Sequence, residues 1–407
     1  MQASGKSISE TRLVSLVALI QFIFVVEFMM VAPLGPDFSL ALNADNADIG
    51  LVVSSYTVAA AIASILLAKI LDRFDRKLVI MFFLGGLSLS TFGCAMSSSI
   101  SELITYRFLA GLFGGPAATI AVSMIIDVVP ESRRGKAIGI VMSAFSISSI
   151  LGIPIGLELS HRGGWELPFI VVSVLIILTI ILLLFMLPTM KTHLDESSVS
   201  PSGKKLKSFT SLFYRPEALV AYFMTMASMM AAFFIVPNIA AFMQFNLQFP
   251  RESYGTLYFV GGAISLLIMR YTGKWIDQFD IRIISLIASL GIAAVLFSGV
   301  VVYPVLIPAA ALFILYMATM SMRNVVSVSI CSMVPDRHER AAFTSINQSI
   351  SHLSAAAGAF IGSIYLSSDE AGNLVGMNVL GLWALILSLV MPFCVYYLSS
   401  YVDRKAL

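Results

Sequence analysis

The hydrophobic pattern of the chain is a series of long apolar segments separated by short polar connections. A helix needs about 20 predominantly apolar residues to cross the hydrocarbon core of a membrane. Twelve segments approach this length, at 13–35, 50–70, 78–97, 103–128, 137–158, 167–188, 217–243, 253–272, 282–300, 305–331, 342–366 and 374–400. The pattern therefore predicts an all-α membrane protein of twelve transmembrane helices, in which neighbouring spans run antiparallel.

One connection is longer and more polar than the others. Residues 191–214 read KTHLDESSVSPSGKKLKSFTSLFY, a mixture of Ser, Pro and Lys that is typical of a flexible linker. We expect this linker to lie in the cytoplasm. It would separate an N-terminal six-helix bundle, residues 1–190, from a C-terminal six-helix bundle, residues 215–407.

The basic residues are distributed unevenly between the two sides of the predicted membrane. If the N-terminus is cytoplasmic, the outer loops hold only Arg162 and Arg251. Cytoplasmic loops of membrane proteins carry the excess of Lys and Arg. Here they comprise Arg73, Arg76, Lys77, Arg133, Arg134, Lys136, Lys191, Lys204, Lys205, Lys207, Arg215, Lys274, Arg282, Arg337 and Arg340. We therefore expect a multi-pass protein of a bacterial inner membrane with both termini in the cytoplasm.

The composition agrees with a chain that is largely surrounded by lipid. Hydrophobic residues make up 58% of it and charged residues only 12%, whereas soluble domains carry about 25% charged residues. The net charge of +2 is too small to indicate a nucleic-acid partner. The three cysteines, Cys94, Cys331 and Cys394, lie far apart in apolar segments, with neither metal-ligand spacing nor a disulfide framework.

The two halves of the chain contain an internal repeat. AKILDRFDRK at 68–77 resembles GKWIDQFDIR at 273–282, and VP recurs at 129–130 and 334–335. Four residues recur at an offset of 205: Lys69, Asp72, Phe74 and Asp75 correspond to Lys274, Asp277, Phe279 and Asp280. Two separate matches at one offset indicate duplication of a six-helix unit. Parallel repeats of this kind are a known transporter architecture, with the binding site at the membrane midplane between the halves.

Two ionisable residues lie inside predicted spans of the N-terminal half. Glu27 is in the first span, and Arg107 is early in the fourth, at a similar depth from the outer side. Charged residues within a membrane are costly and usually face a cavity or a partner. A Glu27–Arg107 coupling, direct or through water, would suit a proton switch. The alternative is a static pair that only positions helices, or for Glu27 a structural hydrogen bond.

Polar residues also interrupt spans of the C-terminal half. Arg323 and Asn324 lie in the tenth span, and Asn347, Gln348 and His352 in the eleventh. Together they could form a polar patch that contacts substrate, or they could make hydrogen bonds between helices, which are common in membrane bundles.

Two spans contain helix-breaking residues. Asn238 follows Pro237 in the seventh span, at a gating bend or an inert kink. In the fifth span Gly152, Pro154 and Gly156 follow a Ser-rich stretch and would permit close helix packing.

Motifs of enzymes are absent from the sequence. It contains no G-x-x-x-x-G-K-[ST] loop for ATP, no H-E-x-x-H, no paired C-x-x-C and no G-x-S-x-G elbow. We therefore expect neither an enzyme nor a bound cofactor or metal. The energy for transport would come from an ion gradient or from the gradient of the solute itself.

With its twelve spans and its repeated loop motif, the whole chain resembles the major facilitator superfamily. Within that superfamily it is similar to the twelve-span drug:proton antiporters and small-solute efflux proteins. The segment 68–77 is similar to the loop signature G-x-L-x-D-R-x-G-R-K of that superfamily. Asp72, Arg73, Arg76 and Lys77 match the signature, and Ala68 and Asp75 replace its two glycines. The resemblance implies two six-helix bundles that rock about a central site.

The resemblance also implies roles for individual residues. The signature residues, with Asp277 in the second copy, would form a cytoplasmic gate in which Asp72 faces the N-terminal end of the eleventh span. Arg107, in RFLAG, corresponds to an arginine implicated in proton transfer. Gly152, Pro154 and Gly156 resemble an antiporter motif of the fifth span with altered spacing.

The expected function is therefore secondary active transport, as proton-coupled efflux of a small organic or amphipathic solute by a monomer. The proton gradient would be the energy source, with Glu27 as the proton-binding acid. One alternative is an importer or facilitator of a polar or anionic metabolite, with Arg323 as the anion anchor. Another is a membrane receptor or scaffold that moves no solute.

Overall fold

The structure is a computed structural model that describes residues 9–406 except 72, 191–211, 213, 303 and 336–338. Asp72 and most of the predicted linker thus lie outside the described residues. The chain forms two compact units of helices. Unit one comprises Met1–Ala44 and Ser55–Ser200, and unit two comprises Asp45–Ser54 and Pro201–Leu407.

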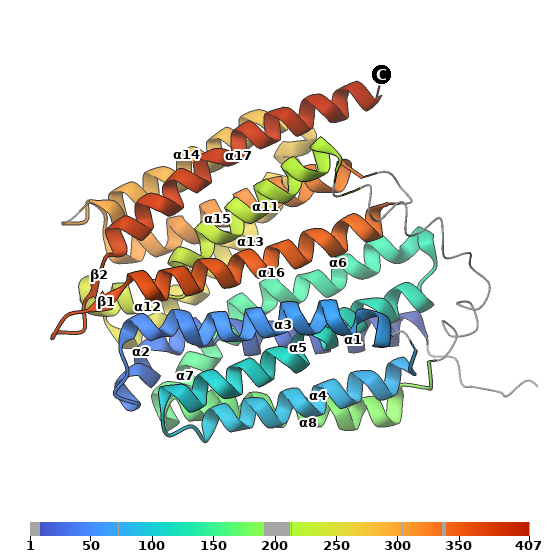
Figure 1. Ribbon diagram of the computed structural model, residues 1–407, viewed down its shortest axis with the longest axis horizontal. Coiled ribbons are helices and arrows are strands. Elements are labelled where there is room, and N and C mark those ends of the chain that lie inside the picture. Colours follow the sequence, from blue (N-terminus) through green and yellow to red (C-terminus); the bar gives the residue numbers. More distant parts are fainter. Residues whose placement is uncertain are drawn as a thin grey trace, which may run out of the picture. The chain divides into compact units, whose positions relative to one another are not determined.

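Unit one is built from long apolar helices that begin and end at short connections. Within it α4 packs along α5 and α8, and α1 packs along α6 (Figure 1). Its elements are α1 (Glu10–Met29), α2 (Val31–Ala41), α3 (Ile49–Leu71), α4 (Arg76–Ala95), α5 (Ile100–Val128), α6 (Glu131–Ile147), η2 (Ser148–Gly152), α7 (Ile153–Gly163) and α8 (Glu166–Met186). The element η2 is a single π-helical turn that joins α6 to α7.

Unit two has the same kind of construction, with α11 packed along α16 and α17 and α14 packed along α17 (Figure 1). Its elements are η1 (Asn46–Asp48), α11 (Pro216–Ile235), α12 (Ile239–Ala241), η3 (Phe242–Asn246), η4 (Arg251–Ser253), α13 (Tyr254–Gln278), α14 (Ile281–Leu296), η5 (Phe297–Val301), α15 (Ala309–Met333), α16 (Arg340–Tyr365), β1 (Ser367–Ser368), β2 (Leu374–Val375) and α17 (Met377–Ala406). The two strands form an antiparallel hairpin in which Ser367 faces Val375.

The start of α3 groups with unit two rather than with the rest of its helix. Asn46 Nδ2 donates to the carbonyl of Gly372 at 3.0 Å, and Ser363 Oγ donates to the carbonyl of Ala47 at 2.7 Å. These bonds attach Asp45–Ser54 to α16 and to the hairpin.

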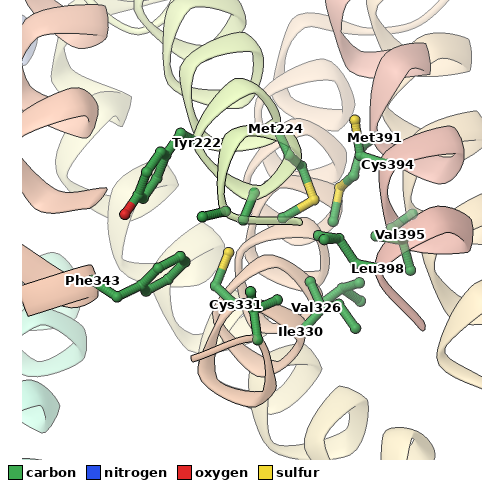
Figure 2. Packing of buried hydrophobic residues seen from close by; sticks show 14 of the residues in the cluster. Tyr222, Met224, Val326, Ile330, Cys331, Phe343, Met391, Cys394, Val395 and Leu398 are labelled. Carbon is green, nitrogen blue, oxygen red and sulfur yellow. The ribbon is translucent and has the colours of Figure 1, made fainter. Parts of the chain in front are cut away.

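The core of unit two contains aromatic and sulfur-containing residues from several helices (Figure 2). Tyr222 of α11 stacks on Phe343 of α16, with ring centroids 5.1 Å apart, and Cys331 of α15 lies in the same cluster. Met391 and Cys394 extend the cluster onto α17. Apolar contact thus joins the four helices, and Cys331 and Cys394 serve as buried packing residues.

The described helices agree with the predicted spans. Nine of them are long and apolar enough to cross a membrane by length and composition. The three remaining predicted spans, 137–158, 253–272 and 342–366, coincide with α6–η2–α7, α13 and α16. These sequences are richer in Gly, Ser and other polar residues, and the π-helical turn divides the first of them.

The sequence repeat forms the same local structure in both units. Asp75 precedes α4, and its Oδ1 accepts a hydrogen bond from the backbone N–H of Lys77 at 2.9 Å. Asp280 precedes α14 and accepts from the backbone N–H of Arg282, also at 2.9 Å. An aspartate at this position satisfies a backbone donor that has no partner inside the helix. The replacement of a signature glycine by Asp75 is therefore explained by its role as an N-cap.

Candidate functional site

The two charged residues predicted inside the N-terminal half contact each other. Arg107 Nη1 on α5 donates a hydrogen bond to Glu27 Oε1 on α1, and both side chains are 0% exposed. Three further polar atoms of the pair, Glu27 Oε2 and Arg107 Nε and Nη2, have no hydrogen-bond partner among the described residues. A buried ion pair whose lone pairs and N–H groups are incompletely satisfied is a costly arrangement. Ionisable residues within membrane spans are rare and commonly pair with one another in the interior of the bundle.

The fifth predicted span packs closely on α1 beside this pair. Gly152 lies against the side chain of Val26, and a Cβ added at Gly152 would overlap it. Ser148 Oγ donates to the carbonyl of Phe22 at 3.1 Å, and Gly156 faces Met30. Pro154 lies in the first turn of α7. The residues of the antiporter-like motif therefore pack along the helix that carries Glu27, and the absence of a side chain at Gly152 permits that approach.

Three residues near the pair were not identified from the sequence. The ring of Tyr56 on α3 lies with its centroid 4.5 Å from Arg107 Cζ. Thr91 and Cys94 on α4 lie close enough to interact with the charges of Glu27 and Arg107. Uncharged residues within an apolar span give no sequence signal that would distinguish them from packing residues.

The loop signature connects helix ends within unit one. Arg76 Nε donates to Asp127 Oδ2 at 3.2 Å, and Lys77 Nζ donates to the carbonyl of Leu184 at 3.0 Å. The sequence analysis did not identify Asp127, at the end of α5, as a partner of Arg76, because their proximity depends on how the helices pack. Arg73 is exposed, as is Asp277 in the last turn of α13.

In unit two, Arg323 is as deeply buried as Arg107 but has different partners. Its Nη2 donates to the carbonyl of Ser228 at 3.0 Å, and its Nη1 to Ser388 Oγ at 3.4 Å. The side chain of Arg323 is thereby enclosed by α11, α15 and α17. Asn324, the next residue, is half-buried.

The other polar residues predicted to bind substrate are spread along unit two. Asn347 is half-buried and its Oδ1 has no hydrogen-bond partner among the described residues, whereas Gln348 and His352 are exposed. Asn238 is fully buried where α11 ends, and its Nδ2 donates to the carbonyl of Phe234 at 3.1 Å. Within the described part of the chain, no hydrogen bond joins Arg323 to these residues.

Comparison with protein families identifies the fold. Residues 17–359 match the family model described as Major Facilitator Superfamily. The chain belongs to this superfamily. The resemblance inferred from the loop signature is thereby confirmed, and the superfamily assignment agrees with a transporter and not with an enzyme.

Relatives within the Major Facilitator Superfamily are distant. The chain is 27% identical over 259 residues to the purine ribonucleoside efflux pump NepI of Escherichia coli K12, covering 62% of this chain and 63% of that protein. It is 26% identical over 251 residues to YceJ of Bacillus subtilis, an uncharacterized MFS-type transporter, with 61% of each chain covered. The chain thus matches less than two thirds of the length of these relatives.

Solved structures of superfamily members share the fold at low identity. A structure of the nucleoside transporter NupG matches with a TM-score of 0.73 and 14% identity, covering 96% of this chain and all of that one. A D-xylose–proton symporter matches with a TM-score of 0.74 and 15% identity, covering 94% of this chain and 97% of that one. These matches establish a multi-pass membrane fold of the superfamily.

Proposed function

We propose that this transporter exports a small organic solute in exchange for protons, with Glu27 as the proton-binding group and Arg107 as its switchable partner. The observation that carries the proposal is the fully buried contact between these two side chains on α1 and α5. In apolar surroundings, an arginine and a carboxylate stabilise each other strongly, and each is costly when left alone.

Proton binding would change the interactions of both residues. Protonation of Glu27 removes its negative charge, so that the attraction to Arg107 is lost and the guanidinium must find other partners. Two states with different partners for Arg107 could bias two conformations of the transporter, because a ligand shifts an equilibrium by its differential affinity for the two states. In exchange transport, a proton from outside and the outgoing solute would each favour a different conformation.

The solute and the direction are supported by one relative. NepI is named as an efflux pump for purine ribonucleosides, which makes such nucleosides the first solutes to assay. The contacts of Arg76 with Asp127 and of Lys77 with α8 support a gating role for the loop signature, in which Asp72 would also take part. We propose further that the protein is a monomer of a bacterial inner membrane with both termini in the cytoplasm.

Transport into inside-out membrane vesicles would test the proposal. An acid-inside pH gradient is expected to drive labelled nucleoside into vesicles that contain the wild-type protein. Glu27→Gln should lose this gradient-driven accumulation but retain exchange of labelled for unlabelled solute, because the amide preserves the shape of the carboxyl but cannot titrate. The matched control is Glu158→Gln, which alters an exposed glutamate on α7.

Two outcomes would contradict parts of the proposal, and one control measurement is needed. Full gradient-driven accumulation by Glu27→Gln would exclude Glu27 as the coupling acid. Solute movement in the direction of the proton flux would indicate import instead of efflux. Thermal unfolding of the purified variant in detergent would show whether a loss of transport reflects a loss of folded protein.

A further inference from the structure

Tyr56 contacts the proposed proton switch through its aromatic ring. It is buried on α3, and its ring centroid lies 4.5 Å from the guanidinium carbon of Arg107. The ring of Phe28, the residue after Glu27, lies with its centroid 5.3 Å from the ring of Tyr56. The guanidinium therefore contacts both a carboxylate, Glu27, and an aromatic face, Tyr56.

The position of Tyr56 depends on glycines in α5. A Cβ added at Gly114 would collide with the hydroxyl of Tyr56, and one added at Gly111 would collide with its backbone carbonyl. Both glycines follow Arg107 on the same helix. Because α5 has no side chain at these two positions, α3 can approach closely and the tyrosine ring can reach the guanidinium.

The groups around Glu27 determine what happens when it binds a proton. Among the described residues, the charged and titratable groups that interact with it are Arg107 from α5, Tyr56 from α3 and Cys94 from α4, together with the hydroxyl of Thr91. Arg107 supplies the only formal positive charge in this set. Once Glu27 is neutral, the arginine is a desolvated cation without a countercharge from these groups.

An aromatic face can stabilise such a cation. The attraction between a guanidinium and an aromatic ring is strongest when both are removed from water, and both side chains are buried. Nε and Nη2 of Arg107 have no hydrogen-bond partner among the described residues, so the ring is an important remaining interaction. We propose that Tyr56 is a positioning residue of the proton switch, whose ring stabilises Arg107 while Glu27 is protonated. The proposal deepens the function proposed above and depends on it.

The proposal predicts the direction of a pH effect. Removal of the ring destabilises the state in which Arg107 has lost its carboxylate partner. Arg107 then interacts more strongly with ionised Glu27, and a higher proton concentration is needed to protonate that acid. The pH midpoint of proton binding should therefore move to lower pH, by about 0.5 to 1 unit.

Three variants separate the ring from the hydroxyl and from general damage. Tyr56→Leu removes the ring and should show the full acid shift. Tyr56→Phe retains the ring and should keep the wild-type midpoint. Gly114→Ala keeps the tyrosine, but the added Cβ would overlap its hydroxyl and push the ring away from the guanidinium, so it should shift the midpoint in the same direction. The double variant Gly114→Ala/Tyr56→Phe removes the overlapping hydroxyl and should restore the midpoint.

The measurement is titration of the carboxyl infrared band of Glu27 in reconstituted protein, assigned by its loss in Glu27→Gln, alongside the pH profile of nucleoside transport. An acid shift in Tyr56→Leu and Gly114→Ala with rescue by phenylalanine supports the proposal. An unchanged midpoint in Tyr56→Leu, or an equal shift in Tyr56→Phe, overturns it.

The two readouts also separate this proposal from the proposed function. If the band shifts as expected but transport proves independent of the pH gradient, proton coupling fails while the positioning role of Tyr56 holds. If transport is proton-driven but the midpoint of folded Tyr56→Leu is unchanged, only the role of Tyr56 fails.

Discussion

Each unit contains a fully buried arginine in the fourth span of its half, and the two arginines have different chemical partners. Arg107 in unit one contacts the carboxylate of Glu27. Arg323 in unit two donates to a backbone carbonyl and to the hydroxyl of Ser388. Hydroxyl and carbonyl oxygens do not titrate near neutral pH, whereas a carboxylate can accept a proton. Of these two arginine sites, only that of unit one therefore combines a buried cation with a protonatable partner.

The positions that correspond in the repeat do not carry corresponding charges. The offset of 205 places Leu312 at the position equivalent to Arg107, Ala232 at that of Glu27, and Ala118 at that of Arg323. The helical framework and the N-caps Asp75 and Asp280 are common to both units, whereas the buried charges are not. The two units thus share a local scaffold but differ in the polar residues of their interiors.

A second difference concerns ion pairs at the starts of corresponding helices. In unit one Glu10 of α1 pairs with Arg133 of α6 at 2.8 Å, and the two side chains are 34% and 63% exposed. In unit two Arg215, at the position equivalent to Glu10, precedes α11 and pairs with Glu339, which precedes α16, at 2.6 Å. There the side chains are 27% and 9% exposed. Glu10 and Arg215 are thus opposite charges at equivalent positions, and the second pair is the more buried.

The largest expected effect is on the stability of unit one. Glu27→Leu leaves Arg107 buried without its carboxylate, which should lower the free energy of unfolding by about 3–5 kcal/mol. The double variant Glu27→Leu/Arg107→Met removes both charges and should recover most of that loss. Urea- or heat-induced unfolding in detergent would measure both. A single variant as stable as wild type would show that the pair is not an important source of stability.

The two ion pairs at the helix starts provide a test of intermediate size. Arg215→Ala removes the ion pair with the buried Glu339 and the hydrogen bonds to Glu217 and Tyr401. The expected loss of stability is about 1.5–3 kcal/mol. Arg133→Ala breaks an exposed pair and should cost about 0.2–1 kcal/mol. Equal losses in the two variants would contradict the role assigned to burial.

The smallest expected effect is local, in the hairpin that follows α16. Asp369 accepts hydrogen bonds from the side chain and backbone of Asn373 and from the backbone of Ala371, which lower the pKa of its carboxyl below the usual 3.8. A lowered pKa means that the ionised form stabilises the hairpin above pH 3.8 and that this stabilisation is lost as the pH falls through the lower value.

Hydrogen exchange of residues 367–376 would test this effect. After correction for intrinsic exchange rates, protection should fall on acidification in the wild type and change little in Asp369→Asn. The connection between α7 and α8 in unit one, which turns at Gly164 with φ 86°, serves as an internal reference. A parallel response of both connections would indicate general acid unfolding.

The sequence predicted the helices, and a coupling of Glu27 with Arg107 that is direct or through water, for the same physical reason. Long apolar segments require lipid or a core, and two opposite charges at equal depth in such segments require each other. The prediction did not extend to Asp127, the partner of Arg76, because that contact depends on which helix ends meet. Tyr56 was also missed, since it is one of 13 tyrosines and aromatic residues are frequent in apolar helices.

The structure also contains features that a pattern of apolar and polar positions does not specify. The π-helical turn Ser148–Gly152 changes the spacing of the fifth predicted span, and it places Gly152 against Val26. The burial of Arg323 among neutral partners depends on the packing of three helices. Periodicity predicts that a helix exists, whereas the neighbours of each side chain follow from long-range packing.

The location of Cys94 has a practical consequence for measuring water entry. It is the only cysteine of unit one and lies beside the Glu27–Arg107 pair, whereas Cys331 and Cys394 belong to unit two. With those two replaced by serine, the natural thiol becomes a single chemical reporter. Because the solvated thiolate is the nucleophile that attacks thiol-specific reagents, the reaction rate at Cys94 would record how often water reaches the buried face of α4 during a transport cycle.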